Sequence, residues 1–233
     1  MNNYFMWNGV SSAQYGIVVK ELPPITFPQE RVSFTDIPGR NGSIAVTEGA
    51  DIYADLLLSC ECYVPGVNNA AEIGAFLRGS GRVFFPNRPS GYYEARIVNQ
   101  IPFKKIVQGN PARTFPVNFR CKPMYHLATG DTEQTVSSGS FILNPTSFAA
   151  KPIIKIVGSG DIYLLVGSQI VSFSGIESGV VLDCEDMEAY WEQTSLNHKT
   201  LGEFPVLPPG STAVSWTGTV SSVKLTPRWV TLL

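Results

Sequence analysis

The chain has 233 residues, of which 15% are charged and 44% hydrophobic, and its formal net charge at pH 7 is -2. The charged fraction is well below the roughly 25% usual for soluble globular proteins, so we expect part of the surface to be buried in an assembly. The nearly balanced charge excludes a dominant electrostatic attraction to nucleic acid or to an anionic membrane. The length suits two domains, each able to bury a core.

The N-terminal stretch MNNYFMWNGV lacks the basic start, apolar run and small-residue cleavage site of a signal peptide. No apolar run approaches the roughly 20 residues of a membrane span, so we expect a soluble protein made in a cytoplasm, with no membrane partner. Cys60 and Cys62 lie two apart in a strand-like run and lack zinc-ligand spacing. We expect them, with Cys121 and Cys184, to be buried free thiols.

The runs RVSFTDI and SIAVTEG alternate with the period of a β-strand and are joined by strong turn residues. They predict a long β-hairpin whose tip is Pro38, Gly39, Arg40, Asn41 and Gly42. Two residues would suffice to reverse the chain, so the longer tip indicates a shaped protrusion. We predict that these five residues form a subunit interface, and the alternative is a solvated turn with an incidental arginine.

The segment NNAAEIGAFLRGSG predicts the helix of the first half of the chain. Asn69 is the expected N-cap, Gly79 the expected stop, and Ile73, Phe76 and Leu77 share one helical face. We expect that face to cover the open side of a sheet.

Residues 73–123 carry nine basic residues and one acid, Glu94. A phosphate-binding face is one interpretation of this imbalance. Because the residues are spread over several elements, without a Lys/Arg cluster or an RNA-binding aromatic motif, a subunit contact or a solvated face is favoured. We predict no sequence-specific nucleic-acid binding. The basic residues are Arg78, Arg82, Arg88, Arg96, Lys104, Lys105, Arg113, Arg120 and Lys122.

The polar stretch LATGDTEQTVSSGS follows FRCKPMYH and places a domain boundary near residue 126. Beyond it, eight strand-like runs recur at spacings of about 8–12 residues, which is typical of a β-sandwich. Glycine-rich turns are expected to separate them, including hairpin turns at residues 158–160 and 167–168.

The usual catalytic signatures are missing: G-x-S-x-G, a Walker loop, H-E-x-x-H and C-x-x-C. His126 and His198 are isolated, and the acidic run 183–192 lacks EF-hand spacing. We therefore predict no enzyme, no catalytic, cofactor-binding or metal-binding residue, and no cofactor. The alternative function is a carbohydrate-binding adhesin for host attachment, whose sugar-stacking side chains would be Trp191, Trp216 and Trp229.

The order of the motifs resembles one known family. FMWNGVSSAQYGIVV, the IPGRNGSI hairpin, AFLRGSGRVFF, YYEARI and FPVNFRCKPMY together resemble the N-terminal domain of the distal tail protein (Dit) of long-tailed siphophages and prophages. VVLDCEDMEAYW and GEFPVLPPGSTAVSWTGTVSSVKLTPRW are similar to that family's galectin-like C-terminal sandwich. The resemblance implies a mainly β fold with two domains. Residues 1–125 would be the ring-forming domain, which contains one short helix, and residues 126–233 would be the galectin-like sandwich.

The resemblance also implies a structural role in a virion tail tip that is assembled in the cytoplasm of a bacterial host. Six copies would form a hub ring, with the N-terminal domains in the ring and the C-terminal domains facing outward. The implied partners are the tail tube protein, the tail-associated lysin (Tal) and, in some phages, receptor-binding proteins. The H-x-N-P-R pattern of true galectins is missing here, so sandwich shape alone implies no sugar binding.

Overall fold

The computed structural model describes residues 4–66, 69–88, 90–106 and 108–233. The chain divides into two compact units, Met1–Tyr125 with Leu232–Leu233, and His126–Thr231. The expected second domain ran to residue 233, whereas the last two residues belong to the first unit. Strands dominate both units, so the predicted mainly β fold class is confirmed. None of the helices in the described ranges is long and apolar enough to cross a membrane.

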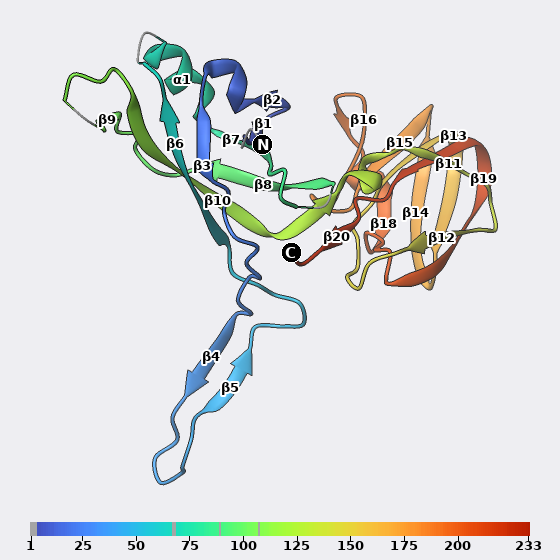
Figure 1. Ribbon diagram of the computed structural model, residues 1–233. Coiled ribbons are helices and arrows are strands. Elements are labelled where there is room, and N and C mark those ends of the chain that lie inside the picture. Colours follow the sequence, from blue (N-terminus) through green and yellow to red (C-terminus); the bar gives the residue numbers. More distant parts are fainter. Residues whose placement is uncertain (1–3, 67–68, 89, 107) are drawn as a thin grey trace. The chain divides into compact units, whose positions relative to one another are not determined.

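The first unit is built on one antiparallel sheet with the strand order β2-β1-β7-β8-β10-β6-β3 (Figure 1). Its longest contact is between β6 and β10, which pair continuously from Arg113 opposite Val64 to Cys121 opposite Leu56. Two short strands, β9 (Lys104–Lys105) and β20 (Val230–Thr231), also pair with β10. The main strands are β1 (Met6–Trp7), β2 (Val10–Ser11), β3 (Val18–Glu21), β6 (Leu56–Val64), β7 (Ser80–Phe84), β8 (Gly91–Ile97) and β10 (Arg113–Leu127).

An aromatic cluster forms the core of this unit. Buried and exposed residues alternate along β6, so that one face of the sheet carries the apolar side chains. The ring of Phe119 lies 5.2 Å from that of Phe5, 5.6 Å from that of Trp7 and 5.7 Å from that of Phe85. Phe5 and Trp7 lie near the N-terminus, Phe85 directly follows β7 and Phe119 lies in β10, so the core joins segments that are far apart in the chain.

The predicted helix is present as α1 (Ala70–Phe76) and buries Ile73 and Leu77, as its apolar spacing indicated. Asn69 is the N-cap, as predicted, although its side chain makes no cap hydrogen bond, and the helix ends with Leu77 as its C-cap, before the expected stop at Gly79. The Asn69 amide instead donates to the carbonyl of Tyr15 at 3.0 Å, in the 3-10 helix η1 (Ser12–Tyr15). At the other end of the helix, the Phe76 ring stacks on Tyr15 with 4.4 Å between the ring centroids, so tertiary contacts with Tyr15 hold both ends.

The predicted hairpin is also confirmed. Strands β4 (Val32–Thr35) and β5 (Ile44–Thr47) pair antiparallel, from Val32 opposite Thr47 to Thr35 opposite Ile44. They form a two-stranded sheet of their own, which extends away from the main sheet of the first unit (Figure 1). We call residues 29–51 the arm.

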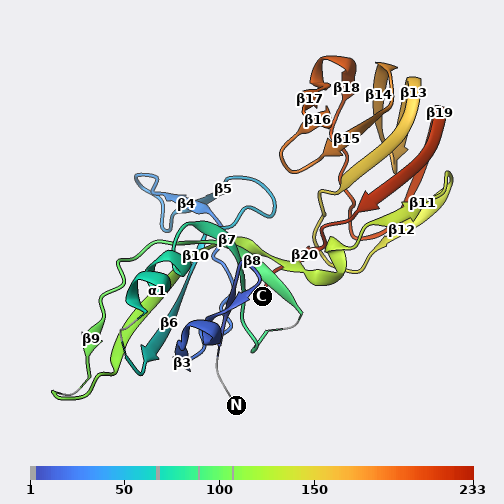
Figure 2. The ribbon, with the colours of Figure 1, turned by 90° about the horizontal axis from the view of Figure 1, so that it is seen from above.

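The second unit is a sandwich whose two layers share two long strands, β13 (Ile153–Val166) and β19 (Gly210–Thr226), which run side by side (Figure 2). The first half of β13 pairs with β15, and its second half pairs with β14. Short 3-10 helices lie at Ala128–Asp131 and Asn197–Lys199. The other strands are β11 (Gln134–Val136), β12 (Ser140–Asn144), β14 (Gln169–Ile176), β15 (Gly179–Asp183), β16 (Glu188–Trp191), β17 (Thr194–Ser195) and β18 (Thr200–Gly202).

The hairpin turn expected at residues 158–160 is not a turn. The register between β13 and β19 shifts on both sides of this segment, and the chain continues within the same strand. A Cβ on Gly158 would lie 2.4 Å from the Thr219 carbonyl oxygen, so only glycine permits the two backbones to approach this closely. The turn expected at residues 167–168 is confirmed, because Val166 pairs with Gln169 across it.

Replacing Gly158 with Ala is therefore expected to destabilise the second unit by about 1–3 kcal/mol, since the methyl group would force the two strands apart. Three of the four tryptophans, Trp191, Trp216 and Trp229, lie in this unit, so urea unfolding followed by tryptophan fluorescence measures the effect. Ser159→Ala, at the next and exposed position, is the control. Equal midpoints for the two variants would contradict the close-approach argument.

Candidate assembly surface

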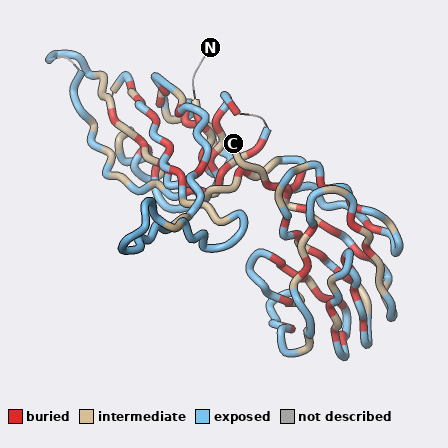
Figure 3. The backbone as a smooth tube through the Cα atoms, turned by 90° about the horizontal axis from the view of Figure 1, so that it is seen from below, coloured by how far each residue is buried: buried red, intermediate tan, exposed pale blue. Residues whose placement is uncertain are grey.

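The arm is exposed along its whole length. Every residue from 29 to 51 is exposed except Val32 and Ile44, which are half-buried (Figure 3). Its large apolar side chains face solvent, with Phe34 69% and Val46 51% exposed. An isolated two-stranded hairpin is at best marginally stable in water, and exposed apolar side chains of this kind are typical of protein contact surfaces.

Backbone hydrogen bonds continue from the β4–β5 ladder to the base of the arm. The Arg31 N–H donates to the Ile52 carbonyl at 2.9 Å, and the Ala54 N–H donates to that of Gln29 at 2.8 Å. Arg31 also forms an ion pair with Glu48 at 2.7 Å across the two legs. Both side chains are about half exposed, so the pair contributes only about 0.2–1 kcal/mol. The ladder fixes the direction of the arm without burying it.

The five predicted interface residues, Pro38, Gly39, Arg40, Asn41 and Gly42, are all exposed at the tip of the arm. The Arg40 N–H donates to the Ile37 carbonyl at 3.1 Å, which closes the turn. Gly39 and Gly42 have φ of 81° and 80°, a left-handed conformation that favours glycine. The glycines thus shape the tip, while Arg40 presents a charge at it.

A buried arginine holds the chain where it enters the arm. Arg88 is only 5% exposed, and its guanidinium donates to the carbonyls of Pro24 at 2.9 Å and Pro23 at 3.3 Å. The Asn87 amide adds a further hydrogen bond to Pro23 at 3.0 Å. In the sequence, Arg88 was one of nine residues of a candidate basic surface. The structure instead places it in the interior of the unit, where carbonyl dipoles compensate its charge.

The guanidinium of Arg88 also lies over the Phe85 ring, 4.9 Å from its centroid, and 5.8 Å from that of Tyr93. Nearby thiols remain protonated. Burial raises the pKa of Cys121 to about 12, although the charge of Arg88 opposes this rise, and burial likewise raises the pKa of Cys60. The predicted buried free thiols are confirmed for Cys60, Cys62, Cys121 and Cys184.

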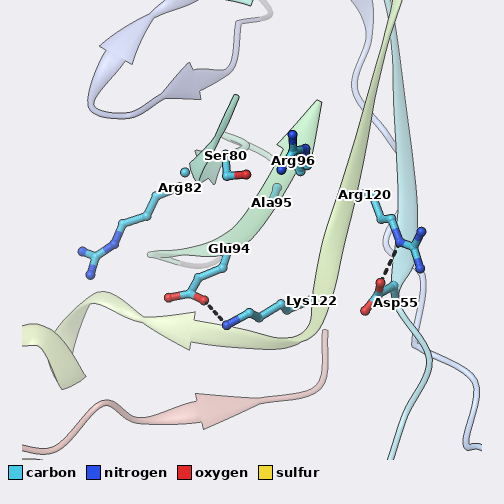
Figure 4. A pocket seen from close by; sticks show the side chains of 9 residues that line it. Asp55, Ser80, Arg82, Glu94, Ala95, Arg96, Arg120 and Lys122 are labelled. Carbon is cyan, nitrogen blue, oxygen red and sulfur yellow. Dashed lines mark hydrogen bonds and ion pairs between the residues drawn. The ribbon is translucent and has the colours of Figure 1, made fainter. Parts of the chain in front are cut away.

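Four of the other basic residues meet in one groove of about 560 Å³ on the first unit (Figure 4). Arg120 forms an ion pair with Asp55 at 2.7 Å, and Lys122 forms one with Glu94 at 2.6 Å. The lining residues come from β7, β8 and β10, with Asp55 between the arm and β6. They are Asp55, Ser80, Gly81, Arg82, Glu94, Ala95, Arg96, Arg120 and Lys122.

The other sequence candidates are not brought together into a reactive site. His198 is exposed, while Asp183 binds Arg228 through two hydrogen bonds of 2.7 and 2.8 Å. Burial raises the pKa of Asp183, but these bonds and the charge of Arg228 outweigh it and leave that pKa below its ordinary value. In the described ranges, no group of three or more His, Cys, Asp or Glu side chains is placed to hold a metal ion. Trp229 is buried, and Trp191 and Trp216 are half-buried.

The fold of the whole chain is shared with solved components of phage tail tips. The Dit protein of phage SPP1 superposes on this chain with a TM-score of 0.69 at 16% identity, over 99% of each chain. That protein is described as a paradigm of the hub adsorption apparatus in phages that infect Gram-positive bacteria. A chain of the phage P2 baseplate, in its activated conformation with calcium, gives a TM-score of 0.54 at 8% identity, over 96% of each chain.

No protein-family model matches the sequence, and no curated protein matches it either. The likeness is therefore one of fold, at low sequence identity.

Arg88→Met is expected to destabilise the first unit by about 1.5–3 kcal/mol, because it removes charge-assisted hydrogen bonds from the carbonyls of Pro23 and Pro24 while it keeps an apolar stem. Urea unfolding followed by far-UV circular dichroism measures this loss. Trypsin cleavage at Arg31 and Arg40 should also accelerate as the base of the arm loosens. Arg78→Met, at an exposed site, is the control, and indistinguishable behaviour of the two variants would refute a fastening role for Arg88.

Proposed function

We propose that this chain is a Dit-type structural protein of a phage or prophage tail tip, six copies of which form a hub ring. The observation that carries the proposal is the exposed arm, in a chain whose full length shares the fold of the SPP1 hub protein. An arm that leaves Phe34, Ile37 and Val46 exposed to solvent is suited to hold a neighbouring copy. The ring-forming part is the first unit, and the second unit is the galectin-like sandwich.

Head-to-tail contact of this kind joins two unlike surfaces, and such contacts close into a ring when the rotation per subunit divides a full turn. The number six comes from the family resemblance. In that arrangement the ring joins the tail tube protein to the tail-associated lysin, and the outward-facing sandwiches are available to receptor-binding proteins. Assembly takes place in the cytoplasm of the bacterial host, before the ring becomes part of the virion.

The alternative function, a carbohydrate-binding adhesin, needs a platform of exposed aromatic side chains. The three tryptophans that the adhesin hypothesis assigned to sugar stacking are buried or half-buried, so they do not form such a platform. Nor does any described group of residues support a hydrolytic function, since His198 is exposed and Asp183 is bound to Arg228.

The purified chain is expected to form closed, head-to-tail oligomers of six copies at high concentration or together with its tail tube and lysin neighbours. Native mass spectrometry and negative-stain electron microscopy measure the stoichiometry and the closure. A monomer in dilute solution agrees with the proposal, because association depends on the concentration of subunits. A strict monomer or an isologous dimer under all of these conditions would overturn it.

Arg40→Ala is expected to weaken this assembly while the monomer remains folded, because substitutions at an exposed tip usually change stability by less than about 0.5 kcal/mol. Sedimentation velocity over a concentration series measures the association, and thermal unfolding of the monomer checks the fold. Arg78→Ala, which removes the same charge outside the arm, is the matched control. If Arg40→Ala associates as strongly as the wild type, the tip is a solvated turn and not a subunit contact.

A further inference from the structure

The groove described above has the form of a site for a peptide segment. Its volume of about 560 Å³ lies within the roughly 300–1,000 Å³ typical of ligand clefts. Ser80, Gly81 and Ala95 contribute lining without long side chains, and the long side chains of Arg82, Arg96, Arg120 and Lys122 come from three neighbouring strands (Figure 4). A segment of chain can therefore reach the floor between flanking cations.

The charges of the groove and of the arm are complementary. The groove contains four cationic side chains and two carboxylates, a net charge of +2. The arm contains four acids and two arginines, a net charge of -2. Each surface has one side chain of the surplus sign available. In the part of the chain that the structure describes, no hydrogen bond or ion pair engages the Arg96 guanidinium of the groove or the Asp36 carboxylate of the arm.

We propose that the groove receives the distal part of the arm from a second copy of this chain, with the Asp36 carboxylate bound to the Arg96 guanidinium of the neighbour. The inference rests on the proposed ring and adds to it the surface that accepts the arm. Asp36 and Arg40 carry opposite charges four residues apart near the tip, and the groove likewise presents both signs. A guanidinium binds a carboxylate through two parallel hydrogen bonds, so this pair sets the register as well as the affinity.

The arm is long enough to reach another molecule. Its outgoing leg covers about twelve residues from Gln29 to Asn41, and an extended chain spans at most about 3.3–3.6 Å per residue, or roughly 40 Å. The exposed Ile37, at 42%, lies between the two charged residues and would be covered by the same contact. The occupant would thereby remove apolar surface from water as well as pair charge.

Nucleic acid is a weaker match to the groove. Asp55 and Glu94 lie among the cations and neutralise Arg120 and Lys122 at 2.7 and 2.6 Å. A phosphate backbone would approach these carboxylates unfavourably, whereas a segment that carries both signs meets a partner for each. The mixed charge of the groove therefore favours a protein segment.

The test is a charge swap in the full-length chain. Arg96→Glu and Asp36→Arg are each expected to weaken self-association about tenfold or more, because each places like charges opposite one another. The double variant, which carries both changes, should recover most of that loss, since every contact again joins opposite signs. Association constants from sedimentation velocity measure the effect, and raising the salt to about 0.5 M should reduce the difference between each single variant and the wild type.

Arg78→Glu makes the same charge change on an exposed side chain outside the groove and is the matched control. Thermal unfolding of each variant monomer should match the wild type, which separates loss of docking from loss of fold. If the wild type forms rings and Arg96→Glu forms them equally well, the groove inference fails and the proposed function stands. If the wild type stays a monomer both at high concentration and together with its tail tube and lysin neighbours, both fail. If Arg96→Glu instead abolishes binding of a short random-sequence DNA duplex while ring formation persists, the groove is a phosphate site and the inference is overturned.

Discussion

The arrangement of the first unit depends on one buried cation. Arg88 has no carboxylate partner among the residues that the structure describes, and its charge is compensated by the carbonyls of Pro23 and Pro24 and by the faces of Phe85 and Tyr93. A cation that has been taken out of water must keep such partners or incur a large desolvation cost. The Pro-Pro segment is therefore held at the sheet at the point where the chain leaves for the arm.

Because the Pro-Pro segment is held at the sheet, the base of the arm is fixed while the rest of the arm extends from it. Beyond it the two legs are joined by ladder hydrogen bonds and by one exposed ion pair, which together maintain an extended ribbon but bury almost none of it. A ribbon of this kind has little cooperative stability of its own, since three or more strands or a packed face are usually needed. Its rigidity must come from its base and, in an assembly, from the surface on which it docks. In the proposed ring, folding of the arm and association of subunits are one coupled process.

The sequence predicted those features whose causes are local. Turn residues between alternating runs located the hairpin, and the spacing of Ile73 and Leu77 located the helix face. Features that depend on distant pairing were missed. The groove is assembled only when β7, β8 and β10 lie side by side, so its residues form no cluster in the sequence. The sequence also does not distinguish the buried Arg88 from the exposed basic residues of residues 73–123. Gly158 was taken for a turn because close approach to Thr219, 61 positions further on, leaves no local signal.

The low fraction of charged residues in the chain corresponds to its exposed apolar surfaces. Exposed apolar side chains are concentrated on the arm and on one layer of the sandwich, where Phe141 and Leu143 of β12, Ile170 of β14 and Leu201 of β18 are each at least 60% exposed. A monomer that had to remain soluble alone would carry charges at these positions. Surfaces of this composition instead favour contact with other proteins, and they occur in both units. The composition thus favours a chain that contacts other proteins, and in the proposed ring the charged groove makes one of these contacts selective.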